Sequence, residues 1–239
     1  CAQIWTFGSG PTHDLQLGKY TLDLQGCRGM VATPKGEAKL EIPLIGAHNL
    51  NNAIAALGAG LALGWNLDDC IDGLSKMASI PGRMETIENN CGITVLVDYA
   101  HSPDALRAVL STLQELKPEN ARIWTLFGCG GDRDASKRPI MGRVAATLSD
   151  HCILTSDNPR SEDPMEIISQ VQAGMPGPVL VEPDRREAIA LAIQSAKEND
   201  IVLLAGKGHE ATQTIGSLVI PLDDRLIAAE ALRNREVIT

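Results

Sequence analysis

Two patterns of hydrophobic and polar residues succeed each other along the chain and meet near residue 82. Upstream, alternating segments punctuated by glycine and proline predict strands at 2–6, 20–24, 30–33 and 39–43. The stretch 45–52 then leads into a helix that ends near 63, and a second helix is expected at 67–77. The Pro81-Gly82 pair then interrupts both periodicities. We therefore expect two domains, at 1–82 and 83–239.

The downstream segment alternates near-continuous apolar runs with amphipathic helical patterns. The apolar runs are 94–97, 123–127, 152–154, 179–181 and 201–204, and the helical patterns are 103–116, 138–148, 165–173 and 185–197. Strands buried on both faces and joined by crossover helices predict an α/β fold, a Rossmann-like and mostly parallel sheet with helices on both faces. A further strand at 218–221 and a helix at 225–233 complete the pattern.

Polar or glycine-rich loops follow four of these apolar runs directly. They occupy 98–103, 128–134, 156–164 and 205–210. Because the carboxyl ends of parallel strands meet at one edge of a sheet, where such folds bind ligands, we expect the four loops to form one site.

The loop at 156–164 carries three groups suited to an amino-acid ligand. Asn158 offers an amide donor and acceptor, Arg160 a planar guanidinium and Asp157 a carboxylate. Together they match a molecule that bears both a carboxylate and an amine. The alternative is a strand-to-helix turn whose polar residues cap and solvate.

The glycine-rich loops resemble nucleotide motifs only in part. Arg133 stands where a dinucleotide fingerprint needs glycine, and Gly208 stands where a phosphate loop needs serine or threonine. Arg133 beside exposed backbone N–H groups instead indicates an anion site, with a tight turn as the alternative. Glu210 could accept from a ligand ammonium or be an exposed carboxylate, and Lys207 is expected to be solvated or paired.

Four further polar residues have both a binding and a structural interpretation. Asp98 could hold a ribose hydroxyl pair or solvate the end of a strand, and His101 could cap the next helix. Asn49 and Asn52 are three positions apart, which predicts a shared helix face, although Asn49 alone would more simply be a helix cap.

Composition narrows the possible environments and partners. The formal net charge of -9 argues against a nucleic-acid groove or an anionic membrane surface. The 6 cysteines are scattered without metal-binding spacing, which is typical of core thiols in a reducing cytoplasm. We see no continuous apolar span of membrane length, and the chain begins at Cys1 rather than methionine, so we expect further sequence upstream.

Six motifs together resemble those of the ATP-dependent Mur ligases of peptidoglycan synthesis, and specifically the members that add diaminopimelate. They lie at 46–52, 81–85, 98–103, 128–134, 157–160 and 206–210, in the family's order and over essentially the whole chain. The resemblance implies that 1–82 is the tail end of the family's α/β ATPase (central) domain. It likewise implies that 83–239 is the amino-acid-binding domain.

The resemblance also implies ligands for the candidate residues. It assigns meso-diaminopimelate to Arg133, Asp157, Asn158, Arg160, Gly206 and Glu210. It assigns ATP, with Mg²⁺ as its cofactor, to Asn49, Asn52, Arg83, Asp98 and His101. The acceptor would be UDP-MurNAc-L-Ala-D-Glu, joined through an acyl phosphate, and no residue of this chain is expected to be a covalent nucleophile or a metal ligand.

The family's phosphate loop, magnesium ligands, carbamylated lysine and UDP-binding domain have no counterpart in this sequence. We therefore expect a C-terminal fragment that is inactive without the missing N-terminal part of the same enzyme. Two alternatives stay open at this point. One is another amide ligase of the superfamily, similar to folylpolyglutamate synthase, and the other is a non-catalytic module that binds an amino acid or a nucleotide.

Overall fold

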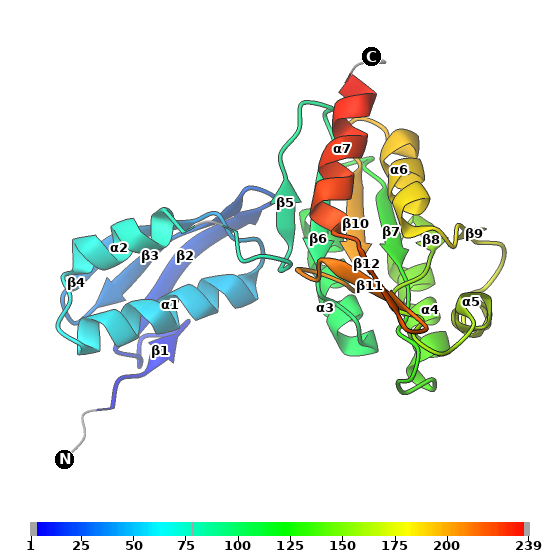
Figure 1. Cartoon of the computed structure of the whole chain (residues 1–239). Helices are drawn as coiled ribbons and strands as arrows, with labels where there is room; N and C mark the ends of the chain where they lie inside the picture. Colours follow the sequence, from blue (N-terminus) through cyan, green and yellow to red (C-terminus); the bar gives the residue numbers. More distant parts are fainter. Residues whose placement is uncertain (1–3, 78, 237–239) are drawn as a thin grey trace. The chain divides into compact units, whose positions relative to one another are not determined.

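The computed structural model describes residues 4–77 and 79–236. It divides into two compact units, Cys1–Ile80 and Pro81–Thr239, which are drawn in Figure 1. The division falls between Ile80 and Pro81, two residues before the expected domain boundary. Each unit has a sheet of its own.

The first unit is a four-stranded sheet with two helices packed against it. Its elements are β1 (Phe7–Gly8), β2 (Leu15–Asp23), β3 (Gly26–Thr33), β4 (Gly36–Ile42), α1 (Ala47–Ala62) and α2 (Leu67–Ser75). Alternate apolar residues of the strands, such as Leu15, Val31 and Leu40, are buried with Leu50 and Ile54 of α1. The prediction of a strand at 2–6 is wrong for residues 4–6, which do not form a strand. Residues 1–3 lie outside the described residues.

The second unit contains the predicted, mostly parallel sheet. Its strands are β5 (Glu85–Ile87), β6 (Thr94–Asp98), β7 (Ile123–Phe127), β8 (His151–Leu154), β9 (Leu180–Val181) and β10 (Ile201–Ala205). The spatial order is β5-β6-β10-β7-β8-β9, and only β5 runs antiparallel to its neighbour. The Rossmann-like α/β prediction is therefore confirmed.

Helices cover both faces of this sheet because the chain reverses its direction across it (Figure 1). The helices are α3 (Pro103–Leu116), α4 (Lys137–Leu148), α5 (Pro164–Gln172), α6 (Arg185–Ser195) and α7 (Asp224–Glu236). From β6 through β7 and β8 to β9 the chain advances in one direction, so right-handed crossovers bring α3, α4 and α5 to one face. The return from β9 to β10 brings α6 to the other face, where α7 joins it.

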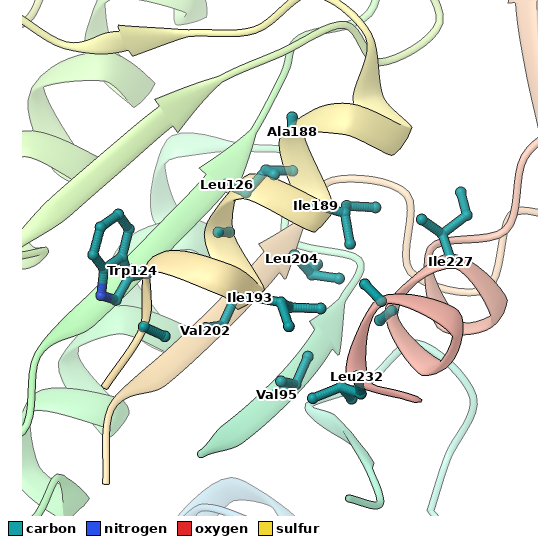
Figure 2. Packing of buried hydrophobic residues seen from close by; sticks show 14 of the residues in the cluster. Val95, Trp124, Leu126, Ala188, Ile189, Ile193, Val202, Leu204, Ile227 and Leu232 are labelled. Atoms are coloured by element: carbon teal, nitrogen blue, oxygen red, sulfur yellow. The ribbon is translucent and has the colours of Figure 1, made fainter. Parts of the chain in front are cut away.

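The core beneath α6 and α7 is aliphatic apart from one tryptophan (Figure 2). Leu126, Val202 and Leu204 of the central strands pack against Ile189 and Ile193 of α6. Burying each such side chain stabilises the fold by roughly 1.5–3 kcal/mol. This packing fixes the strands whose carboxyl ends carry the polar loops.

A separate hairpin of β11 (Thr212–Ile215) and β12 (Leu218–Pro221) follows the central strand. The sequence pattern predicted β12 but missed β11 and β5. Both missed strands are short and polar, with the sequences Thr-Gln-Thr-Ile and Glu-Thr-Ile, so neither shows an apolar run. Within the described residues, no helix is both long and apolar enough to cross a membrane.

Candidate functional site

One cavity of about 320 Å³ lies at the carboxyl ends of β6, β7, β8 and β10. The strands end level with one another, because Ala205 of β10 pairs with Asp98 on one side and Phe127 on the other. The cavity is lined by Tyr99, His101, Gly128, Cys129, Gly130, Arg133, Asp134, Lys137, Asp157, Asn158, Arg160, Gly206 and Glu210. All four polar loops therefore meet in one site, as the predicted sheet requires.

The glycines after β7 allow this loop to lie directly against the loop after β8. A Cβ on Gly128 would lie 2.4 Å from the carbonyl oxygen of Thr155, and one on Gly131 would lie 1.9 Å from that of Pro159. The N–H of Gly131 donates to the carbonyl of Asn158 at 2.9 Å. The glycines are needed for close packing of the two backbones.

The predicted anion site of free backbone N–H groups is not observed at Gly131 and Asp132. The N–H of Gly131 is bonded to Asn158, and the N–H of Asp132 donates to Oε1 of Glu162 at 2.5 Å. Arg133 does line the cavity, but its side chain is exposed and bonds only to the carbonyl of Asp132, at 3.1 Å, within the described residues. These two N–H groups are therefore committed to the loop after β8, and Arg133 contributes a guanidinium to the cavity.

Arg160 is held in place through both its backbone and its side chain. Its φ of 52° is in the left-handed region. Two hydrogen bonds join its backbone to the β11–β12 hairpin: the N–H of Arg160 donates to the carbonyl of Thr214 at 3.0 Å, and its carbonyl accepts from the N–H of Gly216 at 2.6 Å. Its Nη1 donates to the carbonyl of Gly131 at 2.8 Å. One edge of the guanidinium is thereby anchored while the residue lines the cavity.

Asn158 and Glu210 form a hydrogen-bonded pair across the cavity floor. Nδ2 of Asn158 donates to Oε2 of Glu210 at 2.9 Å, and the same oxygen accepts from Nζ of Lys207 at 3.2 Å. Lys207 is fully buried and paired, which excludes the solvated alternative and confirms the paired one. Sequence inspection did not assign it to the site, since a lysine between two glycines gives no sign of burial.

Asp157 lies in the loop after β8 and is buried where this loop meets the loop after β10. Its Oδ1 accepts from the N–H of Asn158 at 2.6 Å, and its carbonyl accepts from Nε2 of the buried Gln213 at 2.6 Å. A Cβ on Gly206, whose φ is 112°, would lie 2.9 Å from Oδ2 of Asp157. Gly206 is therefore required where the two loops touch.

An ion pair between the buried Arg138 and the partly exposed Glu162 joins the two loops that hold most of the candidate residues. Nη1 and Nη2 of Arg138 donate to Glu162 at 2.8 and 2.9 Å, and Nη2 also reaches the carbonyl of Gly130 at 3.1 Å. The Arg138 guanidinium and the N–H of Asp132 lower the pKa of Glu162 to about 2. The sequence pattern alone did not reveal this pair, because its members are 24 residues apart.

Two of the residues suggested for a nucleotide, Asp98 and Arg83, differ in burial and in their hydrogen bonds. Both oxygens of the buried Asp98 carboxylate accept backbone N–H groups, Oδ1 from Ala100 and Oδ2 from Met84, each at 2.8 Å. Asp98 thus anchors the turn that carries Arg83, so the interpretation as a solvated strand end is wrong. Its assignment to a ribose stays a prediction. Arg83 is exposed and its guanidinium carbon lies 5.5 Å from the ring centroid of Tyr99.

His101 lines the cavity without capping the helix that follows it. Its Nδ1 is 2.9 Å from the carbonyl of Tyr99, and its carbonyl accepts from Nζ of Lys137 at 2.8 Å. The cap of α3 is Ser102, whose hydroxyl accepts from the N–H of Ala105 at 3.3 Å. The capping interpretation of His101 is therefore wrong.

Asn49 and Asn52 belong to α1 in the first unit and point to different environments. Asn49 is buried and its Nδ2 donates to the carbonyl of Ile45 at 2.9 Å, whereas Asn52 is exposed. Their spacing of three positions within α1 agrees with the predicted shared helix face, at whose border Asn49 is buried and Asn52 is exposed. The helix begins after Gly46, so Asn49 is not its cap.

Neither a nucleophilic thiol nor a metal cluster is present in the described site. Burial raises the pKa of the Cys129 thiol to about 12, so this cavity-lining cysteine is protonated at neutral pH. Among residues 4–77 and 79–236, no three His, Cys, Asp or Glu side chains come together as metal ligands. The chemistry of the cavity is that of hydrogen bonds and opposite charges.

Comparison of the fold with solved structures identifies the class of protein. A solved UDP-N-acetylmuramoyl-L-alanyl-D-glutamate–2,6-diaminopimelate ligase matches with a TM-score of 0.74 and 37% identity, over 98% of this chain and 48% of that one. Folylpolyglutamate synthase from Thermotoga maritima matches with a TM-score of 0.66 and 22% identity, over 81% of this chain and 44% of that one, and so shares the fold. The two units thus have the fold of an α/β amide ligase.

Sequence comparison identifies the family. The family described as Mur ligase, glutamate ligase domain, matches residues 82–208, and the Mur ligase middle domain matches residues 1–60. A curated UDP-N-acetylmuramoyl-L-alanyl-D-glutamate–2,6-diaminopimelate ligase from Gloeobacter violaceus is 46% identical over 236 residues, which are 98% of this chain and 48% of that protein. The chain belongs to the Mur ligase family. It spans about half the length of the curated relatives it matches.

Proposed function

We propose that this chain is the amino-acid-selecting part of an ATP-dependent ligase that adds meso-diaminopimelate to UDP-MurNAc-L-Ala-D-Glu. The observation that carries the proposal is the single cavity lined by Arg133, Asp157, Asn158, Arg160, Gly206 and Glu210. The similarity to curated diaminopimelate ligases, at 42–46% identity over nearly the whole chain, supports it. A cytoplasmic location is proposed with the function.

The charges of the cavity suit one amino-acid end of diaminopimelate. Arg160 and Arg133 would bind its carboxylate, and Glu210 and Asp157 would accept from its ammonium. Lysine lacks the carboxylate at this end, so it would leave Arg160 and Asn158 without a ligand partner in a closed site. An unpaired polar site of this kind costs on the order of several kcal/mol, which gives selectivity for diaminopimelate.

The other end of diaminopimelate would then carry the reacting amine. In the proposed reaction this amine attacks the acyl phosphate of the D-glutamyl side chain, and phosphate leaves. The residues of this chain would bind and orient the nucleophile, and holding two reactants in line is a large part of such catalysis. No covalent enzyme intermediate is required, in keeping with the protonated Cys129.

In the second unit, Arg83, Asp98 and His101 are proposed to serve the ATP side of the reaction. Arg83 and His101, with Tyr99 between them, present cationic and aromatic groups at the end of β6. Asp98 would act by holding the Arg83 turn, and Asn49 and Asn52 of α1 are separate candidates for ATP within the first unit. The described residues do not provide a carboxylate set for Mg²⁺, so no step is assigned to magnesium on this chain.

Replacing Arg160 tests the proposal in the complete ligase that contains this chain. Arg160→Ala should raise the KM for diaminopimelate on the order of a hundredfold, because a charge-assisted contact to the ligand carboxylate is lost, and change the KM for ATP little. Arg143→Ala, at an exposed position of α4, is the matched control and should change neither. Equal effects of Arg160→Ala on both constants would refute the assignment.

The same assay separates the alternatives. Product formed with glutamate rather than diaminopimelate would favour an enzyme similar to folylpolyglutamate synthase. Binding of diaminopimelate without any product from the complete protein would favour a non-catalytic binding module.

A further inference from the structure

Lys207 is a fully buried lysine in the loop after β10, and it does not itself line the cavity. Burying an ammonium group is unfavourable unless its donors are paired. The Nζ atom has three acceptors, namely Thr212 O at 2.6 Å, Glu210 Oε2 at 3.2 Å and Asn158 Oδ1 at 3.5 Å. Two of these three partners are candidate ligand-binding residues, so Lys207 touches the site from behind.

The contacts of Lys207 determine which way the Asn158 amide faces. Its Oδ1 accepts from the N–H of Thr214 at 2.9 Å as well as facing Nζ of Lys207. A flipped amide would turn its own N–H groups toward these two donors. The oxygen is therefore held on the hairpin side, and Nδ2 is directed to Glu210.

Glu210 is oriented by the same network. Its Oε2 accepts from both Lys207 and Asn158, whereas its Oε1 accepts no hydrogen bond within the described part of the chain. The carboxylate is partly exposed and lines the cavity. One oxygen is thus committed to the protein, and the other is available to a cationic ligand.

We propose that Lys207 is a positioning residue for the amino-acid substrate. It holds the Glu210 carboxylate and the Asn158 amide so that Oε1 and the second Nδ2 hydrogen meet the ammonium and the carboxylate of the substrate. This inference rests on the proposed function, because it takes diaminopimelate as the ligand. It adds a residue that contributes to substrate affinity without touching the substrate.

Lys207→Met tests the inference in the complete ligase, because methionine has a similar length and lacks the charge. The KM for meso-diaminopimelate should rise roughly tenfold to a hundredfold, since charge-assisted contacts that orient two ligand groups are lost. The KM for ATP should stay within about twofold. A merely structural defect would instead lower the amount of active enzyme and affect both substrates alike.

Lys117→Met is the matched control. Nζ of Lys117 pairs with Asp150 at 3.5 Å, and its partly buried side chain lies at the C-terminal end of α3. This variant removes a paired lysine of the same unit away from the cavity lining, so both Michaelis constants should be unchanged.

A second pair of variants keeps the test valid if Lys207→Met does not fold. The double variant K207M/E210Q should fold, because it removes the cation together with its anionic partner. Glu210→Gln should also fold, because the glutamine amide oxygen and the carbonyl of Thr212 still accept from Lys207. If Lys207 acts mainly through Glu210, adding K207M to E210Q should raise the KM for diaminopimelate less than about threefold. A further tenfold rise that persists when Asn158 is also replaced by alanine would overturn the proposal, because Lys207 would then act through neither partner.

The outcomes separate this inference from the function on which it rests. If the unmodified ligase forms product from diaminopimelate and Lys207→Met leaves its KM within about twofold, the positioning role is wrong and the proposed function stands. If the unmodified ligase does not use diaminopimelate, both are overturned.

Discussion

Arg185 and Asp224 form a completely buried ion pair, and breaking it should destabilise the second unit strongly. Nε and Nη2 of Arg185 donate to the two oxygens of Asp224 at 2.8 and 2.6 Å, and both side chains are 0% exposed. The guanidinium also bonds to the carbonyls of Ala205 at 3.0 Å and Ser156 at 3.3 Å. The pair therefore joins the first residues of α6 and α7 to the ends of β8 and β10.

The expected magnitude follows from the isolation of this charge. Burial alone would lower the pKa of the Arg185 guanidinium, but the adjacent Asp224 carboxylate raises it, so the arginine stays charged. Asp224→Leu leaves that charge without its partner, which should lower the free energy of unfolding by about 3–5 kcal/mol. The melting temperature should fall by about 10 °C, since each kcal/mol corresponds to roughly 2–4 °C at this chain length.

A neighbouring pair on the same two helices provides the control. Nη1 of Arg186 lies 3.0 Å from Oε2 of Glu230, with side chains 53% and 57% exposed. Glu230→Leu should lower the free energy of unfolding by at most about 1 kcal/mol, because solvent screens an exposed pair. Both pairs join an arginine of α6 to a carboxylate of α7, but within the described residues the exposed pair has a single hydrogen bond and no carbonyl acceptors.

Urea unfolding followed by tryptophan fluorescence measures these effects in the correct unit. The chain has 3 tryptophans, and Trp124 packs against α6 in the second unit, as Figure 2 shows. Replacing Trp5 and Trp65 by phenylalanine leaves Trp124 as the reporter. A loss below about 1 kcal/mol for Asp224→Leu would refute the reasoning. The double variant R185M/D224L should be more stable than D224L, because no unpaired charge remains.

Three further predictions concern the cavity and the activity of the chain. Gly131→Ala should weaken the binding of diaminopimelate, because the added Cβ would lie 1.9 Å from the carbonyl oxygen of Pro159 and force the two loops apart. Isothermal titration calorimetry measures the affinity, and an unchanged value would contradict this expectation. Arg138 holds the pKa of Glu162 at about 2, below its ordinary 4.5, so the stabilisation is present above pH 4.5 and lost as the pH falls toward 2. The melting temperatures of Glu162→Gln and the unmodified chain should therefore converge over that range, and a constant difference would show that the ion pair does not cause it. The isolated chain should hydrolyse no ATP in a phosphate-release assay, and magnesium-dependent turnover by pure chain would refute this.

Much of the second unit could be predicted because its signals are local. The apolar run at Ile123–Phe127 and the helix at Pro103–Leu116 have the bounds expected from their sequence. Level carboxyl ends of parallel strands then bring the four loops together, whatever the side chains of those loops are. The position of β10 between β6 and β7 has no such local signal, since it depends on pairing across the whole unit.

The partners of the candidate residues were much harder to predict than the residues themselves. Asp98 is committed to two backbone N–H groups, and no sequence pattern distinguishes this from a carboxylate that faces a ligand. Arg138 and Glu162 meet only because two glycines let their loops touch. Burial of Lys207 depends on a hairpin strand that the pattern missed. Long-range contacts of this kind are set by tertiary structure.

The central position of β10 has a consequence for how the protein is made. Synthesis produces β6, β7, β8 and β9 before β10, yet β10 fills the space between β6 and β7. Until residues 201–205 are available, β6 and β7 each present an unpaired edge, the kind of surface through which incomplete chains aggregate. The loop after β10 and the hairpin that clasps Arg160 come later still. A nascent chain therefore lacks the cavity until nearly the whole unit has been translated, and termination anywhere before β10 leaves these edges of β6 and β7 unpaired.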